Sequence, residues 1–91
     1  MSARILHTYN LDARTETLQM PKGAVIHAVT LSEERYEGPR IELHVEEDPE
    51  QEPQARTFGV FYDRNVLPDA AVYVGCVTRY FGASCFVYEL T

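Results

Sequence analysis

Apolar and polar residues alternate along most of this chain, which is the pattern of half-buried β-strands. The alternation is strictest over residues 41–46, where Ile41, Leu43 and Val45 occupy every second position. We expect these three side chains to face the core, and the glutamates and histidine between them to face solvent. Similar patterns predict further strands over 4–11, 15–20, 24–31, 57–62, 72–80 and 85–90.

Short polar turns separate the expected strands. Residues 12–14 connect the first two segments, which therefore look like a hairpin or its equivalent. Pro21 presets φ for the second position of a β-turn, and Gly23 suits the fourth position. Segment 24–31 is apolar on both faces, which favours a central strand that is covered on both sides.

The last twenty residues predict a C-terminal hairpin. Gly82 and Ala83 have the Gly-X form of a two-residue type II′ loop. In that register Cys76 would pair with Glu89, four positions along the ladder from Cys85. At about 3.3 Å per residue the two cysteines would lie roughly 13 Å apart, too far for a disulfide. We therefore expect two free thiols.

These elements predict an all-β fold. About six to seven strands, with no helical period longer than a turn or two, indicate a single small antiparallel β-sandwich or barrel-like sheet. Ninety-one residues form one domain over 1–91. Ten aromatic residues and a hydrophobic fraction of 45% supply one modest core.

The negative charge is concentrated in one segment. Residues 33–52 hold nine acids and two bases, a balance of −7, whereas the rest of the chain carries +1 and the whole chain −6. Within this segment, Pro49 and Pro53 remove ladder donors and neighbouring carboxylates repel one another, which predicts a flexible acidic loop over 47–55. Direct binding of nucleic acid is disfavoured, because it requires a basic surface.

Hydropathy and the N-terminal residues indicate a cytoplasmic protein. No run of the chain approaches the 18 or so apolar residues of a membrane span. The N-terminus lacks the long apolar segment of a secretory signal. We therefore expect no contact with a membrane.

The sequence contains no recognisable catalytic or metal-binding motif. His7, His27 and His44 fall on three different predicted strands, and Cys76 and Cys85 do not form a CxxC pair. Both cysteines lie among apolar strand residues, which favours inert thiols. The single glycines form no phosphate-binding loop. We expect no catalytic residue, no metal and no cofactor.

The acidic segment is the strongest candidate for a binding surface. A dense set of carboxylates can imitate the phosphates of nucleic acid and enter the basic groove of a nucleic-acid-binding protein. A purely solubilising loop is the alternative explanation. Solvated carboxylates are poor general acids, because a raised pKa requires desolvation. The candidate contact residues are Glu42, Glu46, Glu47, Asp48, Glu50 and Glu52.

The order of several motifs resembles that of a family of small uncharacterised phage and prophage proteins, a domain of unknown function. The motifs are the strand around Tyr9-Asn10-Leu11, the turn Met20-Pro21-Lys22-Gly23-Ala24-Val25-Ile26, the segment Arg56-Thr57-Phe58, and Tyr73-Val74-Gly75-Cys76 leading to Phe86-Val87-Tyr88-Glu89. The Met-Pro-x-Gly-Ala-x-Ile turn is the most specific of them. The chain departs from the family at 62–65, where relatives carry a glycine-rich loop. The resemblance implies a phage setting and transfers no functional residue.

Three classes of function follow from these observations. The first is a non-enzymatic accessory protein that binds and modulates a host macromolecule, such as an anti-CRISPR-like inhibitor whose partner is a host protein that normally binds nucleic acid. The second is a structural or virion-assembly component that uses β edges and apolar patches. The third is a small-molecule-binding sponge, for which Tyr36, Tyr62 and Arg64 lie near loops. Exposed edge strands also allow a homodimer.

Overall fold

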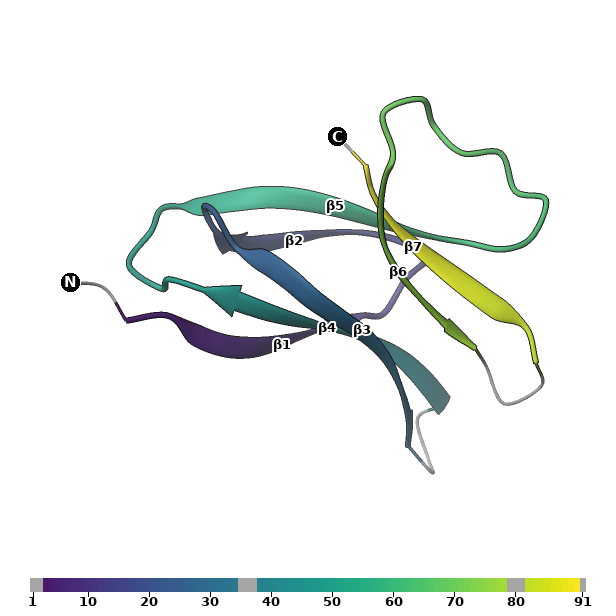
Figure 1. Cartoon of the computed structure of the whole chain (residues 1–91), viewed down its shortest axis with the longest axis horizontal. Helices are drawn as coiled ribbons and strands as arrows, with labels where there is room; N and C mark the ends of the chain where they lie inside the picture. The colour runs from purple at the N-terminus through teal and green to yellow at the C-terminus, as the bar shows by residue number, and fades with distance from the viewer. Residues whose placement is uncertain (1–2, 35–37, 79–81, 91) are drawn as a thin grey trace.

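The computed structural model describes residues 3–34, 38–78 and 82–90, which form seven antiparallel strands in two sheets (Figure 1). The strands are β1 (Ile5–Leu11), β2 (Thr15–Pro21), β3 (Val25–Glu34), β4 (Gly38–Glu47), β5 (Pro53–Phe61), β6 (Val72–Thr78) and β7 (Ser84–Leu90). One sheet has the order β1-β4-β3 and the other β2-β5-β7-β6. The predicted all-β fold with a C-terminal hairpin is confirmed. Within the described ranges, no helix has the length and hydropathy needed to cross a membrane.

The core lies between the two sheets. Ile41, Leu43 and Val45 of β4 point inward, as their alternation predicts, and Phe58 and Val60 of β5 are buried with them. All five side chains are at most 6% exposed. Burying such a side chain contributes roughly 1.5–3 kcal/mol to stability. Strands β4 and β5, which line the core from different sheets, therefore supply much of the apolar stabilisation.

The central strand of the first sheet is β4, and β3 lies at an edge. The prediction that segment 24–31 forms a central, doubly covered strand is wrong. Its second apolar face consists of side chains that remain exposed, including Val25, which is 44% accessible, and Ala28. The inner face of β3 instead packs against β6 of the other sheet, where a Cβ on Gly75 would lie 2.7 Å from Cγ2 of Val29.

The first two strands do not form a hairpin. β1 pairs with β4 and β2 pairs with β5, so residues 12–14 carry the chain from one sheet to the other. The amide of Val60 donates to the carbonyl of Arg14 at 2.7 Å, which attaches this crossing to β5. Short connections between sheets look like hairpin turns in sequence, because both use the same polar residues.

The turn between β2 and β3 differs by one position from the prediction. The amide of Ala24 donates to the carbonyl of Pro21 at 3.2 Å, so Pro21 is the first residue of the turn. Gly23 then occupies the third position, with φ of 84°. This left-handed conformation is what a type II turn requires at that position, and glycine adopts it without a steric penalty.

The C-terminal hairpin has a different register from the one predicted. Thr78 pairs with Ser84 and Cys76 with Phe86, which is a shift of three positions from the predicted pairing of Cys76 with Glu89. A bulge between Tyr73 and Gly75 shifts the register again. Residues 79–81, which include the end of the predicted strand 72–80, lie outside the described residues.

Both cysteines carry free thiols, as predicted, but for a different geometric reason. Cys76 pairs with Phe86 and Cys85 with Val77, so the two cysteines are near neighbours in the ladder. Adjacent positions of a strand point to opposite faces. Cys76 is accordingly exposed while Cys85 is fully buried.

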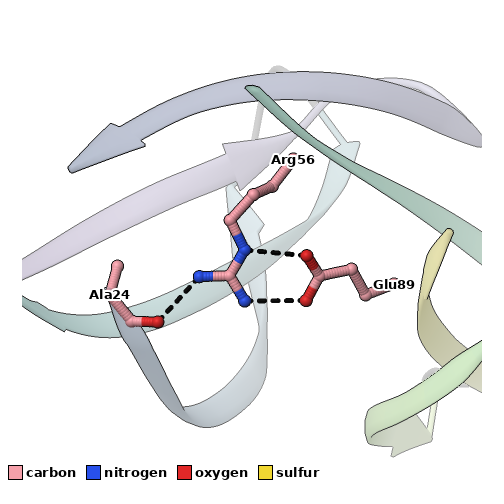
Figure 2. Close-up of polar contacts among 3 residues, drawn as sticks. All are labelled: Ala24, Arg56 and Glu89. Atoms are coloured by element: carbon pink, nitrogen blue, oxygen red, sulfur yellow. Dashed lines mark hydrogen bonds and ion pairs between the residues drawn. The ribbon is translucent and has the colours of Figure 1, made fainter. Parts of the chain in front are cut away.

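A charged fork joins the second sheet to the start of β3 (Figure 2). Arg56 of β5 donates from Nε and Nη2 to the two carboxylate oxygens of Glu89 in β7, at 2.8 and 2.7 Å. Its Nη1 donates to the carbonyl of Ala24 at 2.7 Å. The side chains of Arg56 and Glu89 are only 18% and 20% exposed. Hydrogen bonding to Glu89 raises the pKa of Arg56.

Replacing the carboxylate of this fork should be costly. Glu89→Gln leaves the Arg56 guanidinium with a partner that cannot balance its charge, so we expect the free energy of unfolding to fall by about 2–3 kcal/mol. Urea denaturation measures this. The double variant Arg56→Met/Glu89→Leu should lose less, because no unpaired charge remains. A loss below about 0.5 kcal/mol for Glu89→Gln, as for a surface pair, would contradict a structural role.

The close approach of β3 and β6 gives a second prediction. Gly75→Ala places a methyl group against the branched side chain of Val29, which has few alternative rotamers. We expect a loss of about 1–3 kcal/mol in the free energy of unfolding. Val29→Ala makes room for the methyl group, so the double variant should be more stable than the sum of the single losses predicts. Strictly additive losses would show that the contact does not limit packing.

Candidate functional site

The fold divides the six acidic candidates among three places. Glu42 and Glu46 lie on the outer face of β4, Glu47 lies on its inner face, and Asp48, Glu50 and Glu52 lie in the turn 48–52 between β4 and β5. Along β4, Glu42 and Glu46 are four positions apart, roughly 13 Å at about 3.3 Å per residue. The structure therefore brings Glu46 close to the turn, and leaves Glu42 apart from it.

Glu47 is a buried carboxylate, 6% exposed. It accepts a hydrogen bond of 2.5 Å from the hydroxyl of Tyr9, and its Oε1 lies 3.2 Å from Nδ1 of His7. The His7 and Tyr9 rings lie 4.2 Å apart. Burial and the hydrogen bond to Glu47 raise the pKa of Tyr9. These partners offset the cost of burying the carboxylate.

The expectation that Glu47 belongs to an exposed contact surface is therefore corrected. Strand β4 extends one residue beyond the predicted alternation, and Glu47 takes the inward position that follows Val45. A shift of one residue along a strand changes the face on which a side chain lies.

Glu46 is held by two basic side chains from different strands. Nε2 of His27 lies 2.9 Å from its Oε1, and Arg4 forms an ion pair with its Oε2. The hydrogen bond with His27 and the charge of Arg4 lower the pKa of Glu46. This carboxylate is consequently ionised and locally compensated.

The turn 48–52 is organised by its own hydrogen bonds. The carboxylate of Asp48 accepts from the amide of Glu50 at 3.0 Å, and its carbonyl accepts from the amide of Gln51 at 3.1 Å. The amide of Lys22 donates to the carbonyl of Glu52 at 2.8 Å, which ties this turn to the one before β3. Because β5 begins at Pro53, the acidic loop is shorter than the predicted 47–55.

A small open pocket of about 180 Å³ lies beside this turn. Arg4 and Lys22 line it together with Glu46, Glu47 and Asp48. Both bases and acids therefore line the pocket, and the exposed carboxylates of Glu50 and Glu52 lie next to it along the chain.

The histidines take part in separate local contacts. His7 contacts Glu47, His27 contacts Glu46, and the two ring nitrogens of His44 lie 3.4 Å from Thr8 Oγ1 and 2.7 Å from Thr30 Oγ1. Over residues 3–34, 38–78 and 82–90, no group of three or more His, Cys, Asp or Glu side chains could hold a metal ion.

A second surface lies on the outer face of the other sheet. Phe61, Tyr73, Phe86 and Tyr88 of β5, β6 and β7 form what we call the aromatic face. The Tyr88 ring makes edge contacts with Tyr73 and Phe61, at centroid distances of 5.6 and 5.7 Å. Tyr73 is 54% exposed. Aromatic edge contacts of this kind are usually found in cores and interfaces.

The connection between β5 and β6, residues 62–71, forms a long loop that projects from the second sheet (Figure 1). Several of its residues lie close to the rings of the aromatic face. A groove of about 190 Å³ lies between them, lined by Phe61, Tyr62, Arg64, Leu67, Phe86 and Tyr88. Tyr62 and Arg64, which the sequence suggested for a small-molecule site, thus come together. The third residue of that set, Tyr36, lies outside the described residues.

The start of this connection is a defined turn. The amide of Tyr62 donates to Oδ1 of Asn65 at 2.9 Å, and the amide of Asn65 donates back to the carbonyl of Tyr62 at 3.0 Å. Arg14 lies 5.3 Å from the centre of the Tyr62 ring and donates to Asn65. Arg64 takes a left-handed φ of 69°. These contacts fix the positions of Asp63 and Arg64 at the groove.

This chain matches no protein-family model, no curated protein and no solved structure. The aromatic face was not singled out from the sequence, although a signal for it exists. Residues 85–88 are apolar at both alternating sets of positions, with Cys85 and Val87 buried and Phe86 and Tyr88 at the positions that alternate with them. In a two-layer fold, only one face of a strand can enter the core, so such a pattern places apolar side chains outside.

The contacts of Glu46 predict a pH-dependent stability. Because its pKa is lower in the folded chain than its ordinary value of 4.5, ionised Glu46 favours folding above that pH. This contribution is lost as the pH falls through the folded-state pKa. Glu46→Gln should therefore lower Tm at pH 7, and the difference from wild type should shrink progressively as the pH is lowered below 4.5. Thermal unfolding over this pH range measures it, and a constant difference would contradict the assignment.

Proposed function

We propose that this chain is a non-enzymatic protein that binds and modulates a host macromolecule, in keeping with its resemblance in sequence to phage and prophage proteins. An anti-CRISPR-like inhibitor or another inhibitor of host defence is the class we favour. The observation that carries the proposal is the hydrogen-bonded acidic turn 48–52, from which Glu50 and Glu52 are exposed.

The backbone of this turn is held in place, which favours its use in recognition. A fixed turn loses little conformational freedom on binding, so more of the interaction energy appears as affinity. Clustered carboxylates also accelerate association with a positively charged partner. The partner we infer is a host protein with a basic groove, of the kind that normally binds nucleic acid.

A structural or virion-assembly role is the second candidate. The exposed aromatic face supports it, because permanent assembly contacts bury apolar surface. Mass spectrometry of purified particles separates the two candidates, since an inhibitor of a host protein should be absent from particles and an assembly component should be present in them.

The acidic turn can be tested with two variants of equal net charge. Glu50→Lys/Glu52→Lys and the control Asp12→Lys/Asp69→Lys each raise the net charge of the chain by four. We expect the first variant to lose capture of the host partner by at least about tenfold, because its charges oppose a basic groove, while the control retains it. Affinity capture from host lysate with quantitative mass spectrometry measures this.

Competition with duplex DNA then tests mimicry of nucleic acid. DNA should displace the captured partner from the wild-type chain. If Glu50→Lys/Glu52→Lys and its control Asp12→Lys/Asp69→Lys capture the host partner equally, the acidic turn is excluded as the contact surface.

A further inference from the structure

Exposed apolar side chains gather on one side of the molecule. Three of the seven large hydrophobic residues that are exposed in the described chain lie on the connection 62–71 or on the outer face of β6: Val66, Leu67 and Tyr73. They adjoin the half-buried rings of Phe61, Phe86 and Tyr88. Single exposed apolar residues are common, but a contiguous group next to an aromatic surface marks an interface.

This patch contains both a projection and a recess. Val66 is 90% exposed on the connection 62–71. Immediately beside it, the groove of about 190 Å³ is bounded by Leu67 and by rings of the aromatic face. A twofold interface requires that one surface be complementary to itself. A projecting valine and a groove bounded by Leu67 and aromatic rings on one side and by Asp63, Arg64 and Asn65 on the other meet this requirement.

We propose that the aromatic face is the twofold interface of a homodimer, in which Val66 of each copy enters the groove of the other. The charges of Asp63 and Arg64 at the groove favour a second copy of this chain as its occupant over an unrelated partner. Asp63 and Arg64 stand next to each other, are exposed, and both lie at the groove or at the pocket adjoining it. Neither has a hydrogen bond or ion pair elsewhere in the described chain. Across a twofold axis, Asp63 of one copy meets Arg64 of the other.

The distribution of charge also favours self-association at this place. Two chains of net charge −6 repel each other. The segment 33–52 has a net charge of −7, and the rest of the chain has a net charge of +1. The acidic turn precedes β5 and the connection 62–71 follows it, so the nine residues of β5 separate the two regions. Contact through the aromatic face therefore keeps the acidic segments apart.

The size of the surface is adequate for a weak to moderate dimer. Aromatic side chains bury roughly 150–250 Å² each when fully covered. Four partly exposed rings and two aliphatic side chains supply several hundred Å² per copy, which is in the range of the smaller, weaker interfaces. This dimer does not depend on the proposed function, because its surface excludes the acidic turn.

The mass of the chain in solution tests the interface. In sedimentation equilibrium, the mass of the wild-type chain should rise with concentration to twice the 10.4 kDa of one copy, and this mass should be reached by about 1 mM. Val66→Asp should be monomeric and keep the wild-type circular dichroism, because this side chain is exposed. The control Leu6→Asp, 79% exposed on β1, should remain dimeric. A monomeric wild-type chain overturns the proposal, as does a dimer that persists in Val66→Asp.

The charge pair gives a second, independent measurement. The Asp63→Arg chain and the Arg64→Asp chain should each be monomeric, because like charges then face each other across the axis. Aspartate tolerates the left-handed conformation at position 64 better than most residues do. Mixing the two variants should restore a complex of two chains, since each supplies the charge that the other needs. Mixtures that stay monomeric, or single variants that still dimerise, overturn the twofold arrangement.

Discussion

The Arg56 guanidinium is the contact on which the arrangement of the second sheet depends. It joins β5 to β7 through Glu89 and joins both to the first sheet through the carbonyl of Ala24. Its carbon lies 5.8 Å from the centre of the buried Phe58 ring, so the same group covers the end of the apolar core. A planar donor with several fixed N–H groups can make these contacts together, which a lysine ammonium cannot do.

Strand β5 places two chemically different surfaces at its two ends. The turn that enters it carries exposed carboxylates, and the connection that leaves it carries exposed apolar side chains beside the aromatic face. The inner face of β5 contributes Phe58 and Val60 to the core between them. A rigid strand of nine residues thus keeps the acidic and apolar surfaces at a constant separation, so that each can be altered without changing the other.

Local pattern was enough to predict most strands, but not their partners. The alternation at Ile41, Leu43 and Val45 gave the buried face of β4 directly, because a period of two is a property of the segment itself. Pairing depends on contacts between distant segments. The edge position of β3, the separation of β1 from β2 and the register of β6 against β7 were therefore not predicted.

The candidate site shows the same division. The segment that carries the net charge was recognised from composition alone. The burial of Glu47 was not, because it depends on one further residue of strand and on Tyr9 and His7 from β1. The aromatic face was missed since apolar residues such as Phe86 were assumed to be core residues, and their outward direction follows only from the buried positions of Cys85 and Val87.

The close packing of Gly75 against Val29 makes the two long seams of the sandwich unequal. On that side, β3 and β6 are in close contact, because the Val29 side chain packs directly against the backbone at Gly75. On the opposite side, β1 and β2 are the outer strands of their sheets, and the three-residue crossing 12–14 joins them. When the molecule opens transiently, the two sheets should separate first between β1 and β2 and stay in contact longest between β3 and β6. Backbone amides of β1 and β2 should therefore exchange their hydrogens with solvent soonest.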